Sequence, residues 1–125
     1  MPNLLLVMLG GAAGAGLRYE VGKLALARLG PGFPWGTLIV NLAGGLLMGV
    51  VAGFLFEAGA QQRPLWLLLA VGLLGGFTTF STFSFDLFAM IGHGQHMTGF
   101  AYAAGSVIGS LLLLYAGFFL VRAAA

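Results

Sequence analysis

Residues 75–86 of the chain read GGFTTFSTFSFD, and this stretch decides how the third apolar segment folds. Five of the nine Ser and Thr residues lie between Thr78 and Ser84, and five of the eleven Phe residues lie between Phe77 and Phe88. A glycine pair followed by alternating hydroxyl and aromatic side chains favours a break in a helix. Within a bilayer, irregular backbone persists only where it is buried in protein or lines a wet cavity, and transporters place ion sites at such breaks. The alternative is a continuous helix whose hydroxyls bond to their own carbonyls.

The composition around this stretch is that of a membrane protein. Of 125 residues, 60% are hydrophobic and 6% are charged, whereas a soluble domain has about 25% charged residues. The absence of cysteine excludes disulfides and thiolate metal sites. The five basic residues form no patch of the kind that binds nucleic acid. We therefore expect an all-α membrane protein.

The helices are predicted from the lengths of the apolar segments, because about 20 such residues cross the hydrocarbon core. Four segments qualify, at about residues 3–27, 35–57, 65–91 and 97–122, and turn or breaker residues separate them. This pattern predicts a single transmembrane domain over residues 1–125 with four helices, the third of them broken near the midplane.

The basic residues are balanced between the two faces of this arrangement. Four spans place both termini on one face, which then carries Arg63 and Arg122, while the opposite face carries Lys23 and Arg28. Such a balance gives no orientation under the positive-inside rule. A chain without a preferred orientation can insert both ways, and the two forms can pair as an antiparallel, dual-topology homodimer. A second copy would also help to enclose a polar pathway.

The first span carries charged residues in its second half. Arg18 follows a long apolar run, and facing lipid at that depth would be costly. It either looks into a water-filled vestibule, where it would attract anions, or it is a structural partner of Glu20 or of a lipid phosphate. Glu20 and Lys23 are three residues apart and can pair across one helical turn.

Two sets of residues in the second and fourth spans have helical spacing. Small residues recur every four positions, which predicts close helix packing; they are Gly45, Gly49 and Gly53 in the second span and Ala101, Gly105 and Gly109 in the fourth. Tyr102, Ser106 and Ser110 place three hydroxyls on one face of the fourth span. These hydroxyls either form a polar track or bond to carbonyls one turn back.

The polar residues at the candidate site suit an anion. Asn41, the only strongly polar residue between Thr37 and Glu57, either joins helices or binds a passing ion. Hydroxyl and amide groups donate to anions, and aromatic ring edges carry positive partial charge. Phe80 and Phe83 are three apart and would share a face if the helix resumes after the break; otherwise they are ordinary core residues. A cation would instead favour the face of an aromatic ring or a carboxylate, and no carboxylate is placed centrally.

Three segments together resemble the Fluc/CrcB family of fluoride channels: residues 75–84 with their repeated Phe, Ser and Thr, residues 10–19, and Asn41-Leu42-Ala43-Gly44. The resemblance implies a passive, fluoride-selective channel, not an enzyme, that exports fluoride from the cytoplasm. It implies a multi-pass protein of the cell membrane that assembles as an antiparallel homodimer with two pores.

The resemblance also implies roles for individual residues. The expected pore residues are Asn41, Phe80, Phe83, Tyr102, Ser106 and Ser110, with Arg18 as the vestibule cation. The backbone carbonyls of Gly75 and Thr78 from both copies are expected to bind a structural sodium ion (Na+) at the dimer centre. The chain departs from the family pattern at Leu114, where a further hydroxyl is common, and at Asp86, where glutamate is common; the role of Asp86 stays open.

Two other functions are compatible with four short spans. The first is a small, dual-topology, proton-coupled exporter of cationic compounds, which needs a membrane-embedded carboxylate such as Glu20. The position of Glu20 near the end of its span, beside Lys23, argues against this function. The second is a membrane assembly protein that transports nothing and needs no hydroxyl track.

Overall fold

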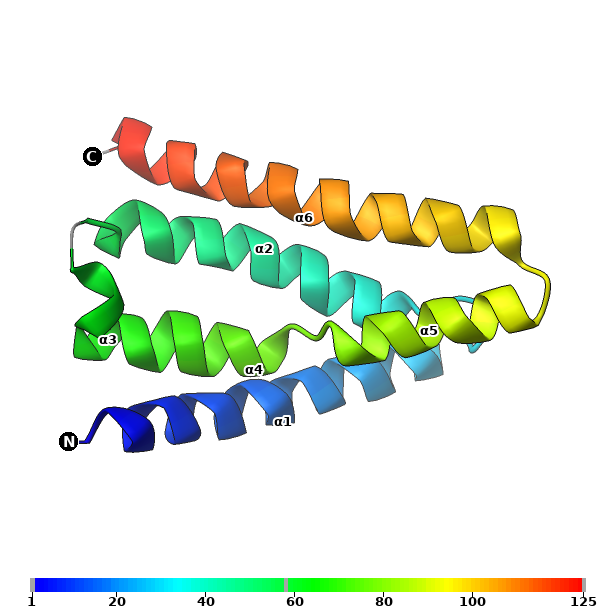
Figure 1. Ribbon diagram of the computed structural model, residues 1–125, viewed down its shortest axis with the longest axis horizontal. Coiled ribbons are helices and arrows are strands. Elements are labelled where there is room, and N and C mark those ends of the chain that lie inside the picture. The colour runs from blue at the N-terminus through cyan, green and yellow to red at the C-terminus, as the bar shows by residue number, and fades with distance from the viewer. Residues whose placement is uncertain (1, 58, 125) are drawn as a thin grey trace.

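The computed structural model describes residues 2–57 and 59–124, and in these residues it has four helical spans that are long and apolar enough to cross a membrane. They are α1 (Asn3–Leu29), α2 (Trp35–Leu55), the composite third span Pro64–Gly92, and α6 (His96–Ala124) (Figure 1). Both ends of the chain lie at the end of the bundle that holds the connection from α2 to α3 (Figure 1). The four spans predicted from the sequence are confirmed.

The third span is interrupted, as the sequence predicts. After the 3-10 turn η1 (Ala60–Gln62), it runs through α3 (Pro64–Trp66), the π-helical segment η2 (Leu67–Leu74) and α4 (Gly75–Phe77). It resumes as α5 (Ser81–Gly92), leaving residues 78–80 outside any helix. Thr78 is extended, with φ −84° and ψ 160°, and the Thr79 hydroxyl accepts a hydrogen bond from the Thr82 N–H at 3.3 Å. This bond satisfies one of the free N–H groups in the first turn of α5. Because residues 78–80 lie outside any helix, the alternative of a continuous helix is wrong.

Glycines allow α1 to lie directly on the backbone of the third span. A Cβ atom added at Gly10 would lie 2.8 Å from the Leu73 nitrogen, and one added at Gly76 would lie 2.6 Å from the Gly11 carbonyl oxygen. Such contacts are possible only where side chains are absent. The first span therefore packs against the segment that leads into the break.

The predicted glycine stripe of α2 packs against α6. An added Cβ would meet backbone of α6 at Gly45 and Gly49 and the Val121 side chain at Gly53. The stripe predicted on α6 is only partly correct, because a Cβ added at Gly109 would touch Leu42 but one at Gly105 would meet nothing within 4 Å. Ala101 is exposed. Gly117, which the stripe omits, packs against the backbone of α2.

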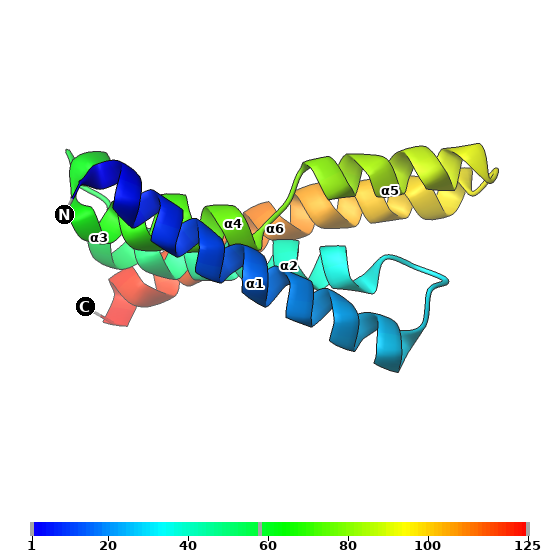
Figure 2. The ribbon, with the colours of Figure 1, turned by 90° about the horizontal axis from the view of Figure 1, so that it is seen from below.

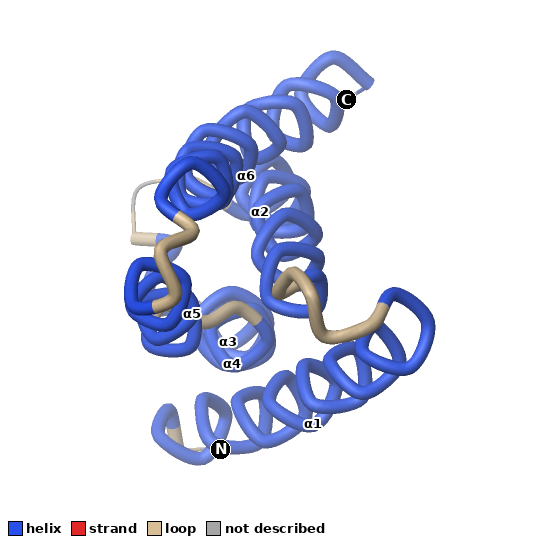
Figure 3. Tube along the Cα trace, turned by 90° about the vertical axis from the view of Figure 1, so that its right-hand side faces the viewer, coloured by secondary structure: helices blue, strands red, loops and turns tan. Residues whose placement is uncertain are grey.

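The bundle opens at the break. Beyond residues 78–80, α5 runs beside the first half of α6 and diverges from the end of α1 (Figure 2). Along the bundle axis, α2 and the third span lie between α1 and α6 (Figure 3). A small buried core lies between α5 and the first half of α6. It consists of Phe83, Met90 and Tyr102, with Phe33 and Leu38 packed against it. The break thus lies where α5 separates from α1 (Figure 2), and it leaves backbone groups of residues 78–80 free for contacts outside a helix.

Candidate functional site

A groove of about 330 Å³ lies where the break meets α2 and α6. It brings together five predicted pore residues: Asn41, Phe80, Phe83, Ser106 and Ser110. The other residues that line it are Gly44, Gly45, Met48, Thr78, Thr79, Val107 and Leu114. None of these lining residues is charged. Leu114, where the resemblance led us to expect a hydroxyl, adds an apolar side chain to this lining.

The two phenylalanines of the groove differ in burial. Their ring centroids are 5.8 Å apart, so the two rings are neighbours, as their spacing predicts. Phe83 is 6% exposed and also packs against Tyr102, with ring centroids 5.1 Å apart. Phe80 is 76% exposed. Phe83 is therefore both a core residue and a groove residue, while Phe80 projects beyond the packing of its own chain.

The three hydroxyls predicted on α6 are not equivalent. Tyr102 is outside the groove lining, and its hydroxyl donates to Asp86 Oδ2 at 2.8 Å. The Ser110 hydroxyl donates to the Asn41 backbone carbonyl at 3.2 Å. Ser106 is 5% exposed, and within the described residues its oxygen has no hydrogen-bond partner. A buried polar atom without a partner is rare and points to a ligand or water, so Ser106 has the hydroxyl best placed to donate to an anion.

Asn41 uses its side chain on the backbone of the break. Its Nδ2 donates to the Thr79 carbonyl at 3.0 Å, and its Oδ1 accepts from the Thr79 N–H at 2.8 Å. The sequence left open whether Asn41 joins helices or binds a passing ion, and in the structure its side chain contacts another helical span. The residue still lines the groove.

Arg18 lies in a neighbouring cleft of about 460 Å³, which Lys23, Thr37, Thr79 and Thr82 also line. Its Nε donates to the Gly76 carbonyl at 3.0 Å, so Arg18 binds the end of α4 and not Glu20. The predicted contact between Glu20 and Lys23 is confirmed, with 3.2 Å between Oε1 and Nζ. Thr79 borders both the groove and this cationic cleft.

The carbonyls expected to bind sodium are released from helical hydrogen bonds by contacts described above. In a continuous helix, the Thr79 and Thr82 N–H groups would bond to the carbonyls of Gly75 and Thr78. The Thr79 N–H instead bonds to Asn41, and the Thr82 N–H bonds to the Thr79 hydroxyl. Carbonyl oxygens are suitable ligands for a hard cation, so the residues present fit the expected ion.

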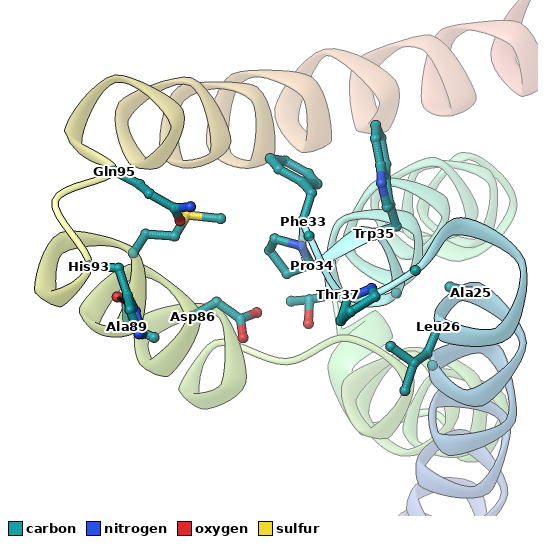
Figure 4. Close-up of a pocket in the computed structure, with 16 residues that line it drawn as sticks. Ala25, Leu26, Phe33, Pro34, Trp35, Thr37, Asp86, Ala89, His93 and Gln95 are labelled. Atoms are coloured by element: carbon teal, nitrogen blue, oxygen red, sulfur yellow. Dashed lines mark hydrogen bonds between the residues drawn. The ribbon is translucent and has the colours of Figure 1, made fainter.

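A larger cleft of about 600 Å³ lies between α5 and the connection from α1 to α2. Asp86 on α5 and Thr37 on α2 point toward the space between them, near Phe33 (Figure 4). Asp86 reaches Tyr102 from this cleft, and Tyr102 in turn contacts Phe83. The sequence left the role of Asp86 open, and the structure shows that its carboxylate accepts a hydrogen bond from the Tyr102 hydroxyl.

Sequence reasoning missed Thr79, which has the most connections at the site. Thr79 bonds to Asn41 through its backbone and to Thr82 through its side chain. Its position in the break was visible, but its partner lies 38 residues away. Gly44 was also missed; a Cβ added there would meet Thr78 Cγ2. The quoted segment Asn41-Leu42-Ala43-Gly44 contained the available signal, because a glycine one turn after the asparagine admits the break.

Comparison with known proteins gives matches over almost the whole chain. The family model described as CrcB-like protein, Camphor Resistance (CrcB), matches residues 5–118. A protein of Sphingopyxis alaskensis is 48% identical over 122 residues, which are 98% of this chain and 97% of that protein. A protein of Phenylobacterium zucineum is 50% identical over 123 residues, which are 98% and 97% of the two chains. Both relatives have the name fluoride-specific ion channel FluC.

Proposed function

The chain belongs to the CrcB family, and we propose that it is a fluoride channel, and not an enzyme, whose ions pass through the groove at the break. The observation that carries the proposal is the buried Ser106 hydroxyl, which has no hydrogen-bond partner among the residues that the structure describes and which lines the same groove as Phe83. A free O–H and the positive edge of an aromatic ring both stabilise an anion. Conduction is passive, down the electrochemical gradient of fluoride.

Selectivity for fluoride follows from the chemistry of the Ser106 hydroxyl and the aromatic ring edges that line the groove. An ion that passes through a narrow pore exchanges its water shell for protein groups, as in other selective channels. Fluoride is small and a strong hydrogen-bond acceptor, so a hydroxyl and ring edges can replace part of its shell at close range. The groove lining has no carboxylate to attract a cation.

Anions enter the groove from the Arg18 cleft. Arg18 gives this cleft positive charge, since Lys23 is paired with Glu20, and Thr79 borders both spaces. A cleft of one charge sign with apolar walls raises the local concentration of the opposite ion. Arg18 therefore attracts fluoride while its Nε holds the Gly76 carbonyl.

A second copy of the chain, inserted in the opposite orientation, completes the pore. The break supports this assembly, because irregular backbone within a bilayer persists only where protein buries it or where it lines a wet cavity, and residues 78–80 lie beside a groove that a single copy leaves open. The balance of Arg63 and Arg122 against Lys23 and Arg28 permits both orientations. The released carbonyls of Gly75 and Thr78 from both copies would hold the structural sodium ion.

The orientation can be tested in cells because the chain has no cysteine. Gln62 is exposed between α2 and α3. In a Gln62→Cys variant, we expect a membrane-impermeant thiol reagent to label about one half of the protein from each side of the membrane, because nothing favours one orientation. A Gln95→Cys variant, in the exposed turn between α5 and α6, is the matched control and should give the same division. Labelling from only one side at each position would contradict dual topology.

The physiological role proposed is export across the cell membrane. Hydrogen fluoride crosses bilayers as a neutral molecule and dissociates in the near-neutral cytoplasm, so fluoride accumulates inside. A passive channel then lets the anion flow outward. Fluoride release from vesicles that contain the purified protein tests the proposal, and vesicles that release no fluoride would contradict it.

The proton-coupled exporter is not favoured. Glu20, its required carboxylate, is exposed on α1 and is paired with Lys23 at 3.2 Å. A carboxylate that already has a cationic partner is poorly placed to exchange a proton for a cationic substrate.

A further inference from the structure

We infer that Asn41 is a positioning residue that holds the break in the shape needed for conduction. The inference rests on the proposed function, since it assigns a role within the same groove. Its basis is the pair of hydrogen bonds between the Asn41 amide and Thr79, of 3.0 Å and 2.8 Å. One side chain thus satisfies both backbone polar groups of one residue.

The contact has the hydrogen-bond pattern of a neighbouring strand. In an antiparallel pair, one residue gives its partner both a donor and an acceptor, and a carboxamide presents the same two groups on one planar unit. Thr79 lies between the extended Thr78 and the start of α5. Within a membrane span, backbone polar groups need partners inside the protein. Asn41 therefore makes the irregular conformation of Thr79 stable.

Asn41 also fixes the opposite wall of the groove. Its backbone carbonyl accepts the Ser110 hydroxyl at 3.2 Å, so this residue of α2 contacts both the break and α6. Phe80 follows Thr79 directly in the chain. The positions of the Phe80 ring and of the Ser110 hydroxyl consequently depend on Asn41, even where the amide does not touch the ion.

A positioning role can be separated from direct ion binding with two variants. Asn41→Ala removes both bonds to Thr79, whereas Ser106→Ala removes a groove hydroxyl that is without a partner in the described part of the chain. We expect both to slow fluoride release from vesicles by about tenfold or more. Only Asn41→Ala should raise the rate of deuterium exchange at the Thr79 N–H, by about tenfold. In this variant the N–H is no longer protected by the hydrogen bond to Asn41. Unchanged exchange at Thr79 in Asn41→Ala would overturn the inference.

A double-mutant cycle tests whether the two groups act together. Incorporation of the α-hydroxy analogue of threonine at position 79 replaces the amide N–H with an ester oxygen and leaves all side chains intact. If Asn41 acts through this N–H, the ester should slow fluoride release in the native background and add little in Asn41→Ala, since coupled partners are not additive. Losses that multiply would overturn the inference, because a general structural effect is independent of the Thr79 N–H.

The controls separate failure of this inference from failure of the proposed function. Size-exclusion chromatography shows whether each variant assembles like the native protein. If native protein releases no fluoride, the proposed function fails, and deuterium exchange at Thr79 still tests the contact with Asn41. If native protein releases fluoride and Asn41→Ala releases it equally fast, only the inference fails.

Discussion

Phe83→Ile is expected to abolish fluoride release from vesicles while the protein still assembles. The Phe83 ring is 6% exposed, lines the groove, and lies with its centroid 5.1 Å from that of Tyr102. Isoleucine keeps an apolar side chain in the core, so the loss of stability should stay below about 2 kcal/mol. It has no aromatic edge to offer an anion. We expect fluoride release to fall at least about 100-fold, equivalent to about 2.8 kcal/mol of lost ion stabilisation.

The matched control for this variant is Phe85→Ile. Phe85 is 65% exposed on α5 and pairs with Phe88, outside the groove lining. Its replacement should leave fluoride release within about twofold, a difference well below 1 kcal/mol. Normal release by Phe83→Ile would remove Phe83 from the pathway, and equal losses in both variants would indicate a general effect of removing aromatic rings.

Gly14→Ala is expected to damage both the fold and conduction. A Cβ at this position would meet the Leu73 carbonyl oxygen and would lie 2.8 Å from the Phe77 nitrogen. Both are backbone atoms, which cannot move aside as a flexible side chain can, and overpacking of this kind costs about 1–3 kcal/mol. Phe77 ends α4 next to the break, so the displacement reaches the groove. We expect lower thermal stability in detergent and slower fluoride release.

Gly16→Ala is the control on the same helix. A Cβ there would meet nothing within 4 Å in the described chain, and alanine favours a helix over glycine by up to about 1 kcal/mol. Its melting temperature should therefore be equal to or above that of the native protein. Equal melting of Gly14→Ala and Gly16→Ala would show that α1 does not pack on the third span as closely as described.

The spans were predictable because hydrophobic length alone determines them. The break was also predictable, since glycines and clustered hydroxyls at residues 75–84 are local signals. The contact of Asn41 with Thr79 was not, because it depends on how α2 packs against residues 38 positions later. The pairing of Tyr102 with Asp86 depends in the same way on how α5 packs against α6.

The glycines illustrate the same limit. Four-residue spacing predicted contacts at Gly45, Gly49 and Gly53, and these are confirmed. The same spacing placed Gly105 in a stripe where it has no neighbour within 4 Å. Spacing identifies the face of a helix on which small residues lie, but the crossing of the helices decides which of them touch. Burial likewise separates Ser106 from Ser110, although the sequence presents them as equivalent.

The measurement that tests the account most directly is simultaneous release of fluoride and chloride from the same vesicles. Vesicles that contain the purified native protein are loaded with potassium fluoride and potassium chloride. They are then diluted into a buffer whose anion cannot cross the membrane. A potassium ionophore then starts efflux, which ion-selective electrodes follow, with protein-free vesicles as the control for leakage. We expect rapid release of the fluoride while the chloride stays inside until detergent is added. Release of both anions at similar rates, or of neither, would contradict a fluoride pathway through the groove of Phe83 and Ser106.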